Sequence, residues 1–313
     1  MNSEGLIDPV FLPFTVGELT EHMPPQGAVS EDRPDRWVNH FVESARRYRE
    51  FLESYPDRRG VSVSAARLAS QIEKDERFWT ASAFMTLIRG PEPIKNLVGL
   101  LANVYGKEVP VDGFDWWDDL VAGRLYLYLE PRLPSPRGFQ DALAERIDQH
   151  PVAYVRMAAR RKGQDELRRT LEGPTNVDAM IVNPDTGFGL LVEAKALSDV
   201  SYDVSFDPVR NQIARNLDVM LEPSSVQPEP LSQRDPDRSF FLLVTPQLFI
   251  DNPTSRLYGW LMNDYRNNHA ALERDLVHRP GELDGVSDRI GWISWETINS
   301  IAPGACGWLE GGD

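Results

Sequence analysis

The sequence contains a single cysteine, Cys306, in 313 residues. One thiol forms no disulfide within a chain and supplies too few ligands for a cysteine-based zinc site. No stretch approaches the roughly 20 apolar residues of a membrane-spanning helix. The first residues lack the basic segment and apolar run of a secretory leader. These absences argue against a disulfide-rich secreted protein and against a membrane protein, and they predict a cytoplasmic one.

Basic residues are scarce as well. The sequence has 33 lysines and arginines against 48 aspartates and glutamates, a net charge of −15. The pI of the sequence is about 4.8. A charge of this sign argues against a protein that coats nucleic acid through bulk electrostatic attraction. A local basic groove remains compatible with it.

Apolar residues make up 41% of the chain, and the length suits one large domain or two ordinary ones. Residues 1–35 are rich in proline, glycine and acidic residues and predict an irregular N-terminal arm. Apolar residues spaced by three and four predict a mainly helical region over 36–136. Prolines at 131, 134 and 136 then interrupt the chain. We therefore expect a second domain at 137–313.

The second domain has alternating helical and strand patterns, which predict an α/β fold with a central sheet flanked by helices. Short apolar runs rich in β-branched and aromatic residues indicate the strands, and longer runs with a period near 3.6 indicate the helices. The expected helices are 139–149, 155–169, 207–221 and 256–276, and the expected strands are 175–183, 188–196, 239–245 and 289–295.

A hairpin at residues 175–196 carries three charges that a buried strand does not need. Five turn-forming residues at 183–187 join two apolar runs, which predicts antiparallel strands. Asp178 interrupts the first run, and Glu193 and Lys195 interrupt the second. Side chains alternate along a strand, so Glu193 and Lys195 point to the same face.

The expected register brings two carboxylates together. If Asn183 pairs with Phe188, Asp178 lies directly opposite Glu193, with Cβ atoms roughly 4.5–5.5 Å apart. Two carboxylates at that distance repel each other unless a cation lies between them. Mg²⁺ prefers oxygen ligands and would relieve the repulsion. The alternative is an ordinary ion network across the two strands.

An Asp in one strand, a Glu-x-Lys in the next and a helix on either side resemble the PD-(D/E)xK nuclease superfamily. The resemblance covers roughly residues 137–296. It implies a restriction-endonuclease-like fold, in which a mixed central sheet is flanked by helices. It also implies that Asp178 and Glu193, with the carbonyl of Ala194, bind Mg²⁺ or substituting Mn²⁺, and that Lys195 acts on the water or the phosphate. One departure is Val177, where the family motif has proline.

The resemblance extends to the flanking helices. Gln212, with Asn216 four residues later, matches a helix that supplies a catalytic Gln in several of these families. The helix at 139–149 matches one that often supplies a Glu, for which Glu145 is the candidate. The basic residues expected to contact a nucleic-acid backbone are Arg160, Arg161, Lys162, Arg210 and Arg215.

The implied activity is that of a Mg²⁺-dependent endonuclease that hydrolyses phosphodiester bonds in DNA, in restriction, defence or repair. The region at 36–136 would then select substrate, form a homodimer or bind partner subunits of such a system. Two alternatives stay open. One is an inactive nuclease fold that serves as an interaction protein, and the other is a nuclease that acts on RNA.

Overall fold

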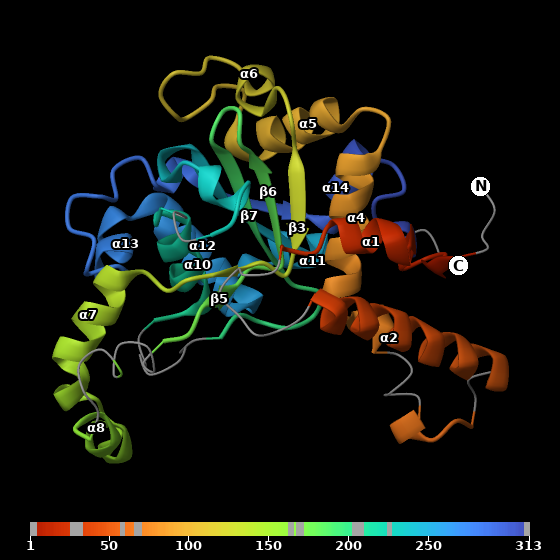
Figure 1. Ribbon diagram of the computed structural model, residues 1–313, viewed down its shortest axis with the longest axis horizontal. Helices are drawn as coiled ribbons and strands as arrows, with labels where there is room; N and C mark the ends of the chain where they lie inside the picture. The colour runs from red at the N-terminus through yellow and green to blue at the C-terminus, as the bar shows by residue number, and fades with distance from the viewer. Residues whose placement is uncertain are drawn as a thin grey trace.

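The structure is a computed structural model. It describes residues 5–25, 34–56, 60–65, 71–161, 166, 172–201, 210–223 and 227–309. A five-stranded mixed sheet with the order β3-β6-β7-β8-β9 forms the centre (Figure 1). Strands β3, β6 and β7 are antiparallel neighbours, whereas β7, β8 and β9 run parallel. The five strands are β3 (Tyr126–Leu129), β6 (Ala179–Asn183), β7 (Phe188–Ala194), β8 (Ser239–Thr245) and β9 (Ile290–Ser294).

The β6–β7 hairpin forms in the expected register, with Asn183 opposite Phe188. The Asn183 side chain accepts a hydrogen bond from the Asp185 amide at 2.9 Å, which tightens the turn. Gly187 has a φ of 81°, a left-handed conformation that glycine adopts without steric cost. The turn residues therefore fix which residues of the two strands face each other.

Both faces of the sheet are covered by helices, which explains why its strands are almost continuously apolar. Leu190 and Val192 of β7 pack with one set of helices (α4, α5 and α14), and Leu191 packs with another (α10, α12 and α13). The helices are α1 (Val16–Glu21), α2 (Pro34–Ser54), α4 (Glu76–Arg89), α5 (Pro93–Tyr105), α6 (Trp117–Val121), α7 (Arg137–Arg146), α8 (Ala153–Ala159), α10 (Gln212–Met220), α11 (Gln247–Asp251), α12 (Leu257–Asn267), α13 (His269–Asp275) and α14 (Trp295–Ile301).

The expected α/β order of the C-terminal half is confirmed, with local differences. The helix expected at 256–276 is two helices, α12 and α13, because the backbone of Asn268 is extended. Of the helix expected at 155–169, α8 covers only the first part, and much of the rest lies outside the described residues. The expected helix start at 207–208 also lies outside them, and α10 begins at Gln212.

Residues 5–25, which the structure describes, do not form the irregular arm expected for 1–35. Strands β1 (Leu6–Asp8) and β2 (Leu12–Thr15) form a small antiparallel pair that leads into α1. Thr15 and Glu18 cap α1 reciprocally, a Thr-x-x-Glu pattern that is readable in the sequence. Strands of three and four residues are too short for a periodicity to reveal them.

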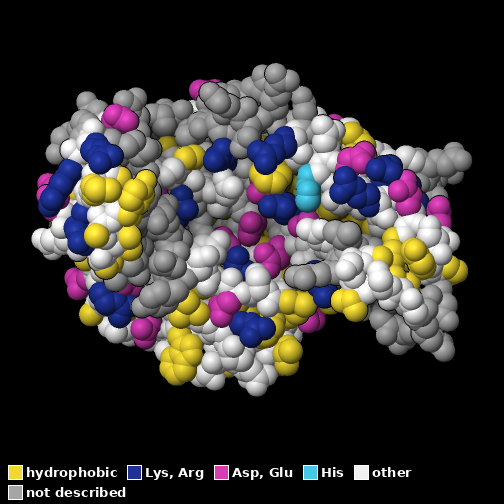
Figure 2. All heavy atoms as spheres, turned by 90° about the horizontal axis from the view of Figure 1, so that it is seen from below, with side chains coloured by type: hydrophobic (Ala, Val, Ile, Leu, Met, Phe, Trp, Pro, Cys, Tyr) yellow, Lys and Arg dark blue, Asp and Glu magenta, His cyan; other side chains and the backbone are white. Residues whose placement is uncertain are grey.

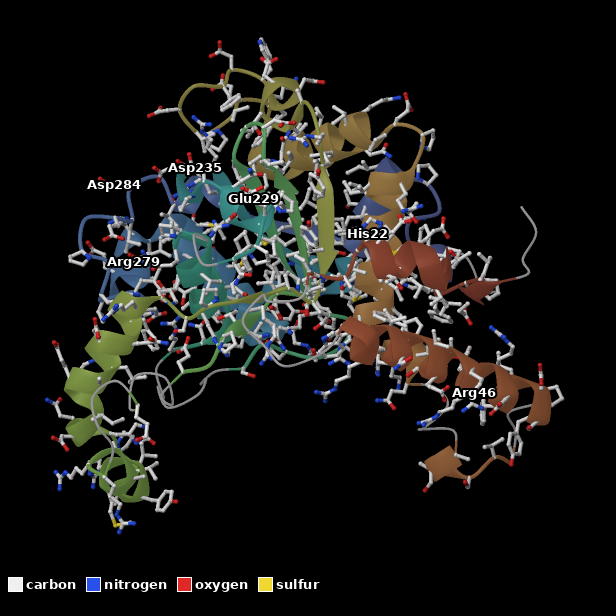
Figure 3. The ribbon with its side chains drawn as sticks, viewed as in Figure 1. His22, Arg46, Glu229, Asp235, Arg279 and Asp284 are labelled. Carbon is white, nitrogen blue, oxygen red and sulfur yellow. The ribbon has the colours of Figure 1, made fainter. Side chains whose placement is uncertain are left out.

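The packing does not divide at residue 137. Strand β3, from the region expected to be mainly helical, is the edge strand beside β6. Helices α4 and α5 bury Phe84 and Leu97 in the same cluster as Leu190 of the sheet. His22, labelled in Figure 3, accepts a bond at its carbonyl from the Leu129 amide at 2.8 Å and so holds the end of β3. The N-terminal half thus belongs to the core of the α/β fold.

Two projections extend from the same side of this body (Figure 1). One is α2, whose outer end carries the exposed Arg46 (Figure 3). The other consists of α7, a short 3-10 helix η2 (Ile147–Gln149) and α8, and it has a small core of its own around Phe139 and Leu143. Strand β5 (Thr175–Asn176), paired with β4 (Arg132–Leu133), lies between the projections. Among the described helices, none has the length and apolar character needed to cross a membrane.

The close packing of α12 provides a test of the fold. A Cβ added to Gly259 of α12 would lie 1.8 Å from the Pro253 carbonyl oxygen, whereas one added to Gly17 of α1 would meet nothing closer than 3.9 Å. Gly259→Ala is expected to lower the free energy of unfolding by about 1–3 kcal/mol, since the backbone must move. The helical control Gly17→Ala is expected to be neutral or slightly stabilising. Urea unfolding of both variants measures the difference, and equal stabilities would contradict this packing.

Candidate active site

The centre of the candidate site is Glu193, a buried carboxylate near the end of β7. It is two residues from Leu191 and so points to the side of the sheet that α10 covers. Its Oε1 accepts hydrogen bonds from Lys195 Nζ at 2.6 Å and Gln212 Nε2 at 2.7 Å. Its Oε2 accepts one from Asn216 Nδ2 at 2.8 Å. Both oxygens of the buried carboxylate are therefore hydrogen-bonded.

Helix α10 positions the two amides that bind Glu193. The Asn211 side chain accepts a bond from the Ala214 amide at 2.9 Å and caps the start of the helix. Gln212 and Asn216 are one turn apart and therefore share a face. The Gln212 Oε1 atom also accepts a bond from the Ser201 amide at 3.3 Å. Both the nitrogen and the oxygen of the Gln212 side-chain amide are therefore hydrogen-bonded. The prediction that Gln212 reaches the strand charges is consistent with this geometry.

Lys195 is buried beside Glu193, and its backbone is held on both sides. Its amide donates to the Val244 carbonyl at 2.8 Å, and its carbonyl accepts from Trp295 Nε1 at 3.0 Å. Burial lowers the pKa of the ammonium group, but the carboxylates of Glu193, Asp178 and Glu76 outweigh burial and raise that pKa above its usual value. Lys195 therefore carries its positive charge at neutral pH.

Asp178 lies one residue before β6 and continues the hairpin register, so its position is opposite Glu193. Its Oδ2 accepts a hydrogen bond from the Ala194 amide at 2.7 Å. Burial raises the pKa of the Asp178 carboxyl well above its usual range, and the charges of Glu193 and Glu130 raise it further. The expected pairing of two carboxylates thus comes with a third acidic group.

That third group, Glu130, was not expected from the sequence. It follows β3, is buried, and has a φ of 54°, a left-handed backbone that is uncommon outside glycine. Its amide donates to the Asp178 carbonyl at 3.1 Å, and its carboxylate lies 3.4 Å from Arg77 Nε. Burial raises its pKa to about 7, against an opposing effect of Arg77. An acidic residue directly after a buried strand is the only sequence signal for this role.

Glu76 at the start of α4 is a second acidic residue that the sequence patterns do not single out. Its Oε1 accepts hydrogen bonds from the Ala196 amide at 3.0 Å and from Ser198 Oγ. The helix expected to supply a Glu was the one at 139–149, with Glu145. In the structure α7 projects away from the sheet, and α4, like α10, reaches β7.

Two of the expected basic residues are structural. Arg210 is fully buried, 2.8 Å from Asp218 and 3.5 Å above the Phe139 ring, so its expected contact with a nucleic-acid backbone is wrong. Arg215 is mostly buried and donates to the carbonyls of Gly173 and Pro174. The two arginines resemble a basic face in the sequence because the sequence does not show which side of α10 is covered.

The other basic residues lie on or beyond α8. Arg160 and Arg161 are exposed at its end, and Lys162 lies outside the described residues. Arg160 forms an exposed ion pair with Asp148 at 2.9 Å. An exposed pair of this kind contributes little stability, so Arg160 remains available to another anion.

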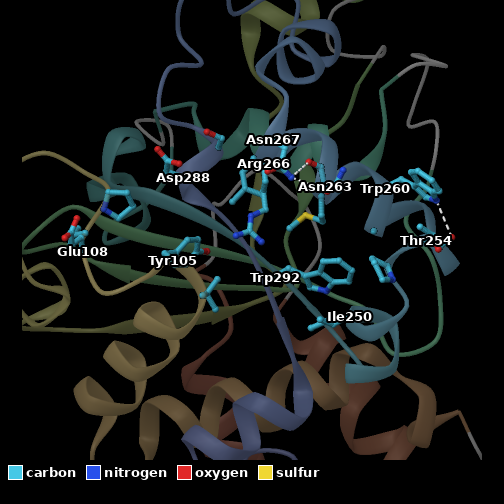
Figure 4. Close-up of a pocket in the computed structure, with 18 residues that line it drawn as sticks. Tyr105, Glu108, Ile250, Thr254, Trp260, Asn263, Arg266, Asn267, Asp288 and Trp292 are labelled. Carbon is cyan, nitrogen blue, oxygen red and sulfur yellow. Dashed lines mark hydrogen bonds between the residues drawn. The ribbon is translucent and has the colours of Figure 1, made fainter.

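The donor set fits Mg²⁺ in chemistry but is not a complete cage. Among the described residues, no three His, Cys, Asp or Glu side chains are grouped closely enough to hold a metal ion. Mg²⁺ is commonly bound through one or two carboxylates while water or phosphate fills its other positions. Asp178 and Glu193 meet that requirement, and their mutual repulsion favours a cation between them. A separate cavity of about 930 Å³, between the end of α5, β9 and α12, contains none of these residues (Figure 4).

Comparisons with known proteins found no similarity: no protein-family model matches the chain, and no curated protein or solved structure does so. The chemistry of this site is therefore inferred from its own geometry.

The raised pKa of Glu130 predicts how stability depends on pH in metal-free protein. The unfolded chain releases this proton near the ordinary pKa of 4.5, whereas the folded protein holds it to about 7. The contribution of Glu130 to the stability of the folded protein is complete below pH 4.5. As pH rises to 7, the free energy of unfolding falls by on the order of 2–3 kcal/mol. Asp178 acts in the same direction. Urea unfolding in EDTA between pH 4.5 and 8 should show a shallower decline for Glu130→Gln than for the wild type, and equal declines would contradict this assignment.

Proposed function

We propose that the chain is a metal-dependent nuclease that hydrolyses phosphodiester bonds, most simply in DNA, with its reaction centre at Asp178, Glu193 and Lys195. The observation that carries the proposal is the buried Glu193 carboxylate, which lies opposite Asp178 and in contact with Lys195 and Gln212. Burying charged side chains on a strand costs several kcal/mol unless they are paired or bound to an ion. The arrangement is the one that the resemblance to PD-(D/E)xK nucleases implies.

In this proposal Asp178 and Glu193 hold Mg²⁺. The bound ion would polarise the phosphodiester and lower the pKa of a water molecule. Asp178 has one oxygen, Oδ2, bonded to the Ala194 amide, which restrains the orientation of the carboxylate. Burial is the main cause of its raised pKa, and the negative charges of Glu193 and Glu130, which would attract the ion, raise it further.

Lys195 is the positively charged group of the proposed reaction. Its ammonium group, charged at neutral pH, would stabilise negative charge that develops on the phosphate. Gln212 orients Glu193 through its Nε2 atom. A role in restriction, defence or repair, action by a homodimer, and cooperation with partner subunits are parts of this proposal that the neighbouring genes and the oligomeric state would test.

One observation favours a second candidate, an inactive nuclease fold that binds partners. Lys195, Gln212 and Asn216 already occupy both oxygens of Glu193, which also describes a purely structural ion network. The two candidates differ in what a divalent ion does. A reaction centre requires it, whereas a structural network gains nothing from it.

Lys195→Ala is expected to abolish cleavage by the purified protein with Mg²⁺ or Mn²⁺, because the site loses the ammonium group that faces Glu193. The wild type should cut plasmid, linear, single-stranded or RNA substrate, and EDTA should stop it. Lys95→Ala is a matched control, since Lys95 is an exposed lysine paired with Glu92 on α5. Normal cutting by Lys195→Ala would place the reaction centre elsewhere, and a wild type that cuts none of the four substrates would support the inactive fold.

Asp178→Asn is expected to weaken binding of Mg²⁺ or Mn²⁺, measured by titration calorimetry. The amide keeps the size of the side chain and removes the negative charge that the metal would contact. Asp185→Asn, at the far end of the same hairpin, is the control and should bind as the wild type does. Unchanged affinity in Asp178→Asn would identify Asp178 as a member of a structural ion network.

A further inference from the structure

The projection formed by α7, η2 and α8, here called the α7–α8 arm, has no part in the chemistry proposed above. Helix α7 contains 10 residues, so it extends by about 15 Å. The arm's own small core of Phe139, Leu143, Ala144, Ile147 and Ala159 makes it a compact unit rather than a loose loop. It extends from the same side of the body as β5, which ends two residues before Asp178 (Figure 1). The arm therefore flanks the approach to the candidate site.

The tip of the arm exposes apolar side chains. Val152, Tyr154 and Met157 are all exposed, and Tyr154 retains 71% of its accessible surface. Seen from below, yellow and dark-blue side chains lie on the side where the arm lies, with acidic side chains among them, and further acidic side chains lie in the central hollow (Figure 2). An aromatic ring, a thioether and a β-branched residue on one short helix are costly to leave in water, which indicates a binding surface.

The tip is also locally basic. Residues 150–161 contain Arg156, Arg160 and Arg161 and no acidic residue, in a chain whose net charge is −15. Arg156 donates to the Pro151 carbonyl and so braces the tip. Arg160 and Arg161 are exposed, and Arg160 pairs at the surface with Asp148 of η2 at 2.9 Å. The surface thus combines positive charge with an apolar centre.

The base of the arm is fixed to the helix that carries Gln212. Arg210, two residues before Gln212, stacks on Phe139 of α7 and pairs with Asp218 of α10. Arg279, beside the base of α7 in Figure 3, also pairs with Asp218. A buried charge network of this kind is destabilised strongly when one member is lost. The tip is consequently held at a set position relative to the site.

We propose that the tip of the α7–α8 arm binds double-stranded nucleic acid beside the cleavage point, with Arg160 and Arg161 on the phosphates and Tyr154 and Met157 against a groove. This inference rests on the proposed function. Arginines supply the attraction to the backbone, and inserted apolar side chains are a known means of holding and bending a duplex.

The position of the arm favours a duplex over a single strand. The proposed reaction centre lies at the end of the sheet. The tip of the arm lies at the outer end of α7, so the length of that helix separates it from the body. A thick, stiff duplex touches both places at once, but a single strand in the site does not need the arm. The acidic central hollow also makes a local basic contact necessary, because phosphate is otherwise repelled.

The binding test uses Lys195→Ala protein, so that substrate stays intact. Fluorescence anisotropy with a labelled DNA duplex measures the effect of Tyr154→Ala and of Arg160→Glu with Arg161→Glu. The first is expected to weaken binding about tenfold, and the second to weaken it further and reduce the slope of log K against log salt by about 2. Binding of a single-stranded oligonucleotide should change less.

Matched controls exist at the opposite end of the molecule. Arg124 has the same exposure as Arg160, 68%, and the same 2.9 Å pairing, with Asp185. Trp116 is 65% exposed, close to Tyr154. Arg124→Glu and Trp116→Ala are expected to bind the duplex as the unmodified protein does. Circular dichroism checks that every variant is folded.

The outcomes separate this inference from the proposed function. If the wild type cuts DNA while the arm variants bind the duplex like the controls, the arm inference is overturned and the nuclease proposal stands. If the wild type cuts nothing but the arm variants lose duplex binding, the nuclease proposal is overturned and duplex binding by the arm stands. If the arm variants instead change the oligomeric state in light scattering at unchanged duplex affinity, the tip is an interface between copies and the inference fails.

Discussion

The structure depends on one buried negative charge. A carboxylate removed from water costs several kcal/mol unless it is paired and hydrogen-bonded. Glu193 meets that requirement only because helix α10 meets the end of β7. The strand itself supplies Lys195, and α10 supplies the amides of Gln212 and Asn216. The hairpin register, the cap of α10 and the parallel pairing of β7 with β8 all serve to hold these groups within hydrogen-bonding distance.

The surroundings of Glu193 contain more acidic groups than Lys195 balances. Asp178 and Glu130 both have raised pKa values because burial and neighbouring carboxylates oppose their ionisation. Arg77 reaches Glu130 only at 3.4 Å and from a partly exposed position. A purely structural network would be expected to neutralise its charges more completely. The imbalance is what a site for a divalent cation would show in the metal-free protein.

Much of this arrangement was accessible from the sequence, for identifiable reasons. Strand alternation and the turn residues 183–187 fixed the facing of Asp178 and Glu193, and helical spacing placed Gln212 beside them. The sequence does not show which residues at the start of α10 are buried, because Arg210 is covered by Phe139, which lies 71 positions earlier in the chain. Glu130 and Glu76 were missed for the same reason. Their roles arise from tertiary contacts of β3 and α4, which a pattern along the chain does not encode.

The hydrogen bonds of Glu193 indicate how a closed site would open to a metal ion. One N–H donor must leave the carboxylate. Lys195 is held by two backbone bonds, to Val244 and Trp295, and its charge favours staying. Gln212 is neutral, and its side chain also bonds the Ser201 amide through Oε1. Asn216 is neutral as well, so in the proposed site one of these two amides, and not Lys195, would give way to the ion. Gln212 begins the helix to which the α7–α8 arm is anchored through Arg210. If both proposals hold, a substrate on the arm and a metal ion at Glu193 would act on the two ends of this short connection.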